Sequence, residues 1–140
     1  MGRLVFSLAV FLCGGPPLLA QTHESYGIGK RYIVTISEEA LRKSPAWDAD
    51  AENPPLSARK ALKLADEKKA KLVQDSKSRK WELQAIALMP GGDDKWYWLV
   101  HYEARPRVGG TGINPFLRLA VLMNGTVIDP KVQDYPPRKE

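Results

Sequence analysis

Two long runs of strand-forming residues, separated by a short turn sequence, place the strongest constraint on the fold of this chain. The first run is Trp81–Met89, and the second is Lys95–Ala104, which is dense in aromatic and β-branched residues. Between them stand residues 90–94 (PGGDD), whose residue types favour tight turns. Two such runs joined by so short a connection predict an antiparallel hairpin. The fold must therefore supply cover for the faces of a β-sheet.

Other segments predict further strands of the same sheet. Tyr32–Ile36 is β-branched and aromatic, and Phe116–Met123 ends at Asn124-Gly125, a pair that favours a type I′ hairpin turn. A short return over Thr126–Ile128 is expected after this turn. The Gly-rich stretch 105–114 is expected to be a long connection, and such loops often carry contacts.

The clearest helix is predicted to follow the N-cap residue Ser57 and to run to about Gln74. Its apolar residues recur with the period of an amphipathic helix and form one stripe: Ala58, Ala61, Leu62, Ala65, Leu72 and Val73. One further helical turn is expected over Glu38–Arg42, followed by an irregular crossing. Because helix and strands are grouped along the chain, the order predicts an α+β fold. In it, one main helix packs on an antiparallel sheet of about four strands.

The first twenty residues have the features of a cleavable export signal. Arg3 supplies positive charge, Leu4–Cys13 supply an apolar run, and Ala20 is a small residue before Gln21. The alternative is a membrane anchor, which needs about 20 uninterrupted apolar residues, whereas residues 14–17 (GGPP) interrupt this run. We therefore expect an exported protein, periplasmic or secreted, after cleavage near Ala20-Gln21.

Cleavage at this point would divide the chain into three parts. We expect a signal peptide over 1–20, a single α+β domain over 21–130 and a flexible tail over 131–140. Within the domain, the polar segment 21–29 is expected to be a loose arm. Cys13 is the only cysteine of the chain, so the mature domain would be stabilised by its core rather than by disulfides.

Positive charge is concentrated on and just after the predicted helix. Nine Lys or Arg residues lie between Arg59 and Lys80, against three carboxylates. Lys68, Lys69 and Lys71 form a candidate anion surface, which would contact anionic lipid, as a peripheral membrane contact, or an envelope polymer. The alternative is a solvated helix face. Nucleic acid is not expected as a partner, because this helix has no interleaved aromatic residues.

Large side chains occupy both faces of the predicted strand Lys95–Ala104. A single helix covers only one face of a sheet, so the other face could bind a partner. The candidate partner surface is formed by Tyr97, Leu99 and His101. The alternative is that these side chains fill the core.

No convergent catalytic or metal-binding set is visible in the sequence. His101 is the only histidine in a predicted strand, and His23 lies in the expected loose arm. A metal site needs several convergent ligands, and nucleophilic catalysis needs a Ser or Cys with a histidine base and a carboxylate. We therefore expect a protein that is not an enzyme, with no catalytic residue, cofactor or metal. A hydrolase that uses His101 is the alternative.

The Ala-spaced helix and the final hairpin resemble the PepSY and PepSY-like group of small exported bacterial domains. The resemblance covers about residues 55–130 and is carried by 57–65 (SARKALKLA), by the strands from Trp81 and Lys95, and by 119–129 (LAVLMNGTVID). It implies a secreted or periplasmic binding domain without enzymatic activity, one that modulates a peptidase or another envelope protein. The cystatin-like architecture, a curved sheet around one helix, would also fit.

Overall fold

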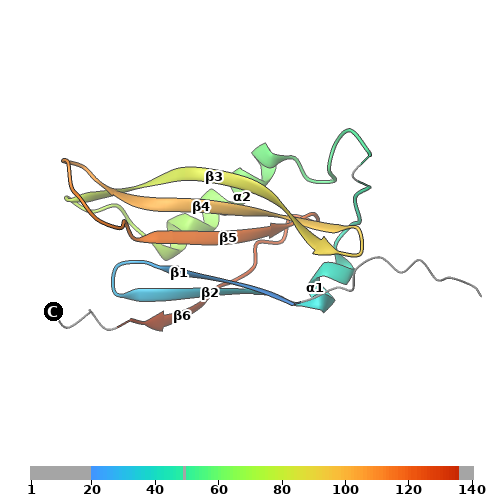
Figure 1. Ribbon diagram of the computed structural model, residues 1–140, viewed down its shortest axis with the longest axis horizontal. Helices are drawn as coiled ribbons and strands as arrows, with labels where there is room; N and C mark the ends of the chain where they lie inside the picture. Colours follow the sequence, from blue (N-terminus) through green and yellow to red (C-terminus); the bar gives the residue numbers. More distant parts are fainter. Residues whose placement is uncertain (1–19, 49, 136–140) are drawn as a thin grey trace, which may run out of the picture.

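Two three-stranded antiparallel sheets make up most of the computed structural model, which describes residues 20–48 and 50–135 (Figure 1). Within these residues the chain forms six strands and two helices. The predicted α+β class is confirmed, but the expected single sheet of about four strands is wrong. The predicted export signal lies outside the described residues except for Ala20, and so do residues 136–140 of the predicted tail.

The larger sheet has the strand order β3-β4-β5. β3 (Arg79–Gly92) and β4 (Lys95–Pro106) form the predicted hairpin, and β5 (Phe116–Leu122) pairs with β4. Asp93 and Asp94 make the hairpin turn with positive φ angles of 49° and 56°. A type I′ turn requires this backbone conformation at both central residues, and Asp tolerates it better than most residues.

The smaller sheet has the order β1-β2-β6 and contains two strands that the sequence did not predict. β2 (Lys30–Ile36) includes the expected strand and lies between β1 (Gln21–Tyr26) and β6 (Lys131–Asp134). The prediction of a loose arm over 21–29 is therefore wrong, as is a flexible tail over 131–134. Both segments are polar, and they become strands because β2 offers each of them an edge with which to pair.

The main helix, α2 (Ala58–Leu72), covers one face of the larger sheet (Figure 1). The side chain of Ser57 caps it as predicted and accepts a hydrogen bond from the backbone N–H of Lys60 at 3.2 Å. The small buried residues Ala61 and Ala65 allow the helix to lie close to the sheet. Their neighbours in this core are large buried side chains of the three strands: Trp81, Val100, Tyr102, Leu117, Leu119 and Val121.

The opposite face of the larger sheet packs partly on the smaller sheet. β1 and β2 lie against β5, and the short helix α1 (Glu38–Lys43), predicted as a single turn, closes one end of this second core (Figure 1). The core is formed by buried residues of β2, α1, β4 and β5: Val34, Ile36, Leu41, Tyr97, Ala120 and Leu122. The sheet face that a single helix would leave open is therefore covered along part of its length.

The outer edge of β5 is filled rather than open. Ser25 of β1 is fully buried, and its hydroxyl oxygen accepts a hydrogen bond from the backbone N–H of Arg118 at 3.1 Å. Further along, the predicted return after Asn124-Gly125 pairs with the same edge, because the N–H of Ile128 donates to the carbonyl of Ala120 at 3.0 Å. An open edge would present unpaired backbone groups to other chains. Here β1 and the return segment use them.

Replacing Ser25 tests this junction between the two sheets. We expect Ser25→Ala to lower the free energy of unfolding by about 1–3 kcal/mol, since the part-buried N–H of Arg118 would lose its partner. Urea denaturation of the whole chain measures this, with Thr22→Ala on the exposed side of the same strand as the control. If both variants unfold at the same urea concentration, the hydrogen bond does not stabilise the junction.

Candidate functional site

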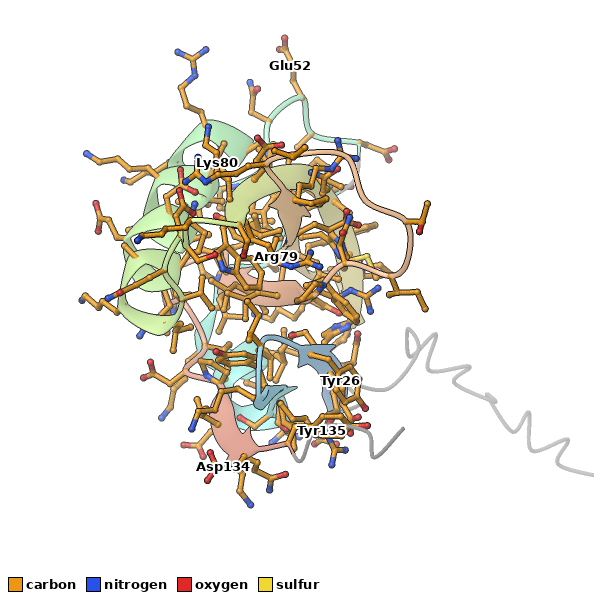
Figure 2. All side chains as sticks on the ribbon, turned by 90° about the vertical axis from the view of Figure 1, so that its left-hand side faces the viewer. Tyr26, Glu52, Arg79, Lys80, Asp134 and Tyr135 are labelled. Carbon is orange, nitrogen blue, oxygen red and sulfur yellow. The ribbon has the colours of Figure 1, made fainter. Side chains whose placement is uncertain are left out.

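An open pocket of about 570 Å³ lies at one end of the molecule, between β1 and the connection that precedes β5. This is the end that faces the viewer in Figure 2, where Tyr26 and Tyr135 lie next to each other. Its walls come from segments far apart in the sequence: Tyr26, Gly27, Ile113, Asn114, Pro115, Phe116 and Tyr135. We call this feature the aromatic pocket.

Three aromatic rings form the walls of the aromatic pocket. The ring centroids of Tyr26 and Tyr135 are 5.2 Å apart, and those of Tyr26 and Phe116 are 6.1 Å apart, both in edge-to-face contact. This is a favourable arrangement for aromatic pairs. Tyr135 is 42 % exposed, and Ile113 at the rim is 94 % exposed. A concave group of rings with an exposed aliphatic rim is typical of a binding surface.

Backbone geometry in the β1–β2 turn places two of these rings. A Cβ atom at Gly27 would lie 2.8 Å from the ring of Tyr32, so any other residue there would require this buried ring to move. Gly29 has a φ of 69°, in the left-handed region that favours glycine. The carbonyl of Gly29 then accepts a hydrogen bond from the backbone N–H of Tyr135 at 3.0 Å, which ties Tyr135 to this turn. The hydroxyl of Tyr26 donates to the carboxylate of Glu24 at 3.0 Å.

A polar row leads away from Phe116 along β4 and β5. The imidazole of His101 stacks on Phe116, with centroids 5.5 Å apart and ring planes 11° apart. Its Nδ1 accepts a hydrogen bond from Nε of Arg118 at 3.2 Å, so its Nε2 carries the proton and donates to Glu103 at 3.3 Å. The guanidinium of Arg118 also lies over Phe116, with Cζ 5.1 Å from the ring centroid. We call these residues the His101–Arg118 row.

His23 of β1 lies close to this row and is partly buried. Burial lowers the pKa of His23, and the positive charge of Arg118 lowers it further. Its Nε2 lies 2.8 Å from the hydroxyl of Tyr97. That hydroxyl donates to the side chain of Gln21, so His23 is the donor toward Tyr97.

The structure separates the residues of the predicted partner surface. Tyr97 is 0 % exposed, so the expectation that it faces a partner is wrong. It is covered by β1, the segment that the sequence indicated as a loose arm. Leu99 is half-buried beside this second core, and only His101 reaches the candidate site, in the row next to the aromatic pocket.

The candidate anion surface is also divided. Lys68 forms an ion pair with Asp129, and the ammonium group of Lys69 lies over the ring of Tyr102 at 4.8 Å. Lys71 is exposed and makes no ion pair with any residue that the structure describes. Of the three lysines, Lys71 alone is therefore fully available to an anion.

Sequence reasoning missed the three rings of the aromatic pocket. Tyr26 and Tyr135 lie in segments that were expected to be irregular, and Phe116 was only the first residue of a predicted strand. The signal that could have revealed Tyr26 is the pair Gly27 and Gly29, which stands directly before a strong strand. Two glycines at this spacing are typical of a hairpin turn.

Among residues 20–48 and 50–135, no three or more potential metal-ligating side chains come together. In the same part of the chain, neither helix has the length and apolar character needed to cross a membrane. The chain matches no family model, and searches of curated proteins and of solved structures found no significant match. The resemblance to the PepSY group therefore stays a prediction, and the site is interpreted from its geometry.

The lowered pKa of His23 predicts a pH dependence of stability. The unfolded histidine has a pKa of 6.5, above the folded value, so the unfolded state binds more protons as pH falls below 6.5. The contribution of neutral His23 to stability is fully present above this pH, and it declines as pH falls toward the lowered pKa of the folded state. We expect His23→Gln, which keeps a donor for Tyr97, to lose less stability between about pH 7.5 and about pH 5.5.

Urea midpoints of the wild-type chain and of His23→Gln at both pH values check this expectation. Glu24 and Asp134, whose pKa values are lowered by their ion pairs, titrate below this window and contribute equally to both proteins. An equal decrease in the two midpoints would mean that His23 does not cause the pH dependence.

Proposed function

We propose that this chain is a small exported domain that acts by binding a protein partner at the aromatic pocket, with no chemistry of its own. The observation that carries the proposal is the group of apolar side chains left open to solvent around this pocket. Burying apolar surface is favourable by roughly 25 cal/mol per Å². The side chains of Ile113 and Tyr135 keep much of their apolar surface exposed to solvent in the folded chain. Burying this surface against a partner would contribute favourably to the free energy of binding.

The state of His101 supports binding over catalysis. A histidine base needs a ring nitrogen directed at the group whose proton it removes. In this chain Nδ1 accepts from Arg118 and Nε2 donates to Glu103. Both nitrogens are therefore engaged within the protein, which argues against the alternative of a hydrolase that uses His101.

The resemblance to PepSY-like domains belongs to the same proposal, as does the cystatin-like architecture. α2 packs on an antiparallel sheet through Ala61 and Ala65, and β5 is followed by the Asn124-Gly125 turn and a short paired return. These features are compatible with one helix on a curved sheet, and the smaller sheet is an addition to that arrangement. On this basis the partner would be a peptidase or another envelope protein, and the pattern of residues 1–20 supports export.

Affinity capture with matched variants tests the proposed function. The whole chain is used to retain partners from envelope and secreted fractions of its native source. We expect the double variant Ile113→Ser with Tyr135→Ser to retain the partner at least about tenfold less than the wild type, since two apolar contacts are lost.

The control for this experiment is Val108→Ser. Val108 is 85 % exposed in the connection before β5, like Ile113, but does not line the aromatic pocket. Retention by the control should equal that by the wild type. A partner held equally by the pocket variant would show that binding takes place elsewhere, and the absence of any retained partner would contradict the proposal.

A second candidate function is association of α2 with an anionic lipid surface or envelope polymer. Arg59 and Lys60 are exposed in the first turn of α2, which contains no acidic residue. Cations at a helix N-terminus oppose the helix dipole at a cost of about 0.3–1 kcal/mol each. The stability of the helix therefore does not explain their position, which favours a role at the surface.

Binding to vesicles of phosphatidylglycerol and phosphatidylcholine tests this second function. Raising the ionic strength from about 0.01 M to about 0.15 M shortens the Debye length from about 30 Å to about 8 Å and should weaken binding. Charge reversal at Arg59, Lys60 and Lys71 should abolish it, while reversal at Lys68 would also break its pair with Asp129. Binding that is independent of salt, or binding that is equally strong to vesicles of pure phosphatidylcholine, contradicts a role for these charges.

A further inference from the structure

Arg118 is a half-buried cation beside the aromatic pocket, and it forms no ion pair with any carboxylate of residues 20–48 and 50–135. Its Nε donates to His101. Within that same part of the chain, no hydrogen bond occupies its two terminal nitrogens. A half-buried guanidinium with unused donors is suited to an anionic ligand.

The charged groups on the strands next to Arg118 leave a positive surplus. β1 contributes His23 and Glu24, and Glu24 is paired with Arg31 of β2. β4 contributes His101, Glu103 and Arg105, and the carboxylate of Glu103 lies 3.3 Å from His101 and 3.9 Å from Arg105. The carboxylates of Glu24 and Glu103 are thus engaged by other groups. A ligand with one negative charge would compensate Arg118.

Phe116 joins this cation to the aromatic pocket. Its ring lines the pocket and meets the ring of Tyr26, and it also carries Arg118 with Cζ 5.1 Å from its centroid. A ligand that uses both features must therefore place an apolar group and an anion about one side chain apart.

We propose that the aromatic pocket and Arg118 together bind the free C-terminus of a partner peptide whose last residue is aromatic or large and aliphatic. The last side chain enters the aromatic pocket, and the α-carboxylate accepts hydrogen bonds from the guanidinium of Arg118. This inference rests on the binding function proposed above and names the part of the partner that is recognised.

The short separation between the aromatic pocket and Arg118 favours a terminal carboxylate over an acidic side chain as the anion. An α-carboxylate is attached to the same Cα as the last side chain. The carboxylate and that side chain are therefore separated by about the width of one ring, such as that of Phe116. In an extended segment, the side chain of the next residue points to the opposite face, and that of the second residue lies about 7 Å away. The open rim at Ile113 and Tyr135 leaves a path for the rest of the peptide, which favours a peptide over a small enclosed acid.

Fluorescence anisotropy with three labelled peptides and the whole chain tests this proposal. The first is an octapeptide of glycine and serine that ends in phenylalanine with a free carboxylate. The second has the same sequence with an amidated end, and the third is amidated with an aspartate two residues before the phenylalanine. We expect the first to bind at least about tenfold more tightly than the other two, because only it offers Arg118 a terminal carboxylate.

Variants locate the binding. We expect Arg118→Gln to remove the preference for the free carboxylate, while Arg42→Gln, the same change at an exposed position of α1, retains it. Tyr135→Ser should weaken the free and amidated peptides by the same factor, because it alters the apolar contact alone. The urea midpoint of each variant confirms that it is folded, and if Arg118→Gln unfolds, Arg118→Lys, which should weaken the preference, replaces it.

The outcomes separate this inference from the proposed function. Equal binding of the free and amidated peptides overturns recognition of the carboxylate, and tighter binding of the third peptide shows that an acidic side chain is recognised instead. Failure of all three peptides to bind also overturns the inference. In each of these cases the proposed function is judged separately, by whether the pocket variant loses its captured partner.

Discussion

The fold depends on β5, which must be buried on both faces and along its outer edge. Leu117, Leu119 and Val121 point into the core under α2, while Ala120 and Leu122 point into the second core. A strand that is apolar on both faces cannot lie at the surface of a single helix-covered sheet. The smaller sheet provides the missing cover, and the hydroxyl of Ser25 satisfies the backbone of β5 where the two sheets meet.

The candidate site follows from the same strand. Every second residue along β5 lies on the same face, and on the face toward the smaller sheet these residues change from Leu122 and Ala120 to Arg118 and Phe116. The covered part of this face forms a core, and the part beyond it holds a cation and an aromatic ring. Core and candidate binding surface are thus continuous, and the position of β1 determines where one ends and the other begins.

Local patterns in the sequence predicted the elements whose residues carry their own signal. The hairpin of β3 and β4, the helix after Ser57 and the strand at β2 were found because their periodicity or turn residues are strong. β1 and β6 were missed because their stability comes from pairing with β2, which no local window contains. Because β1 was not predicted, Tyr97, which β1 covers, was expected to be exposed. The aromatic pocket was missed for the same reason, since Tyr26 lies in β1 and Tyr135 directly follows β6.

The hydrogen bond between Tyr135 and Gly29 has a consequence for how binding and folding are linked. It fixes a wall of the pocket to the turn between β1 and β2. Tyr135 is the residue that directly follows β6, the strand that pairs with β2. A ligand that needs Tyr135 in this place binds only chains in which β6 is docked, so its binding free energy adds to the stability of that pairing. A ligand bound in the pocket would then stabilise β6 against local unfolding from the edge of the smaller sheet.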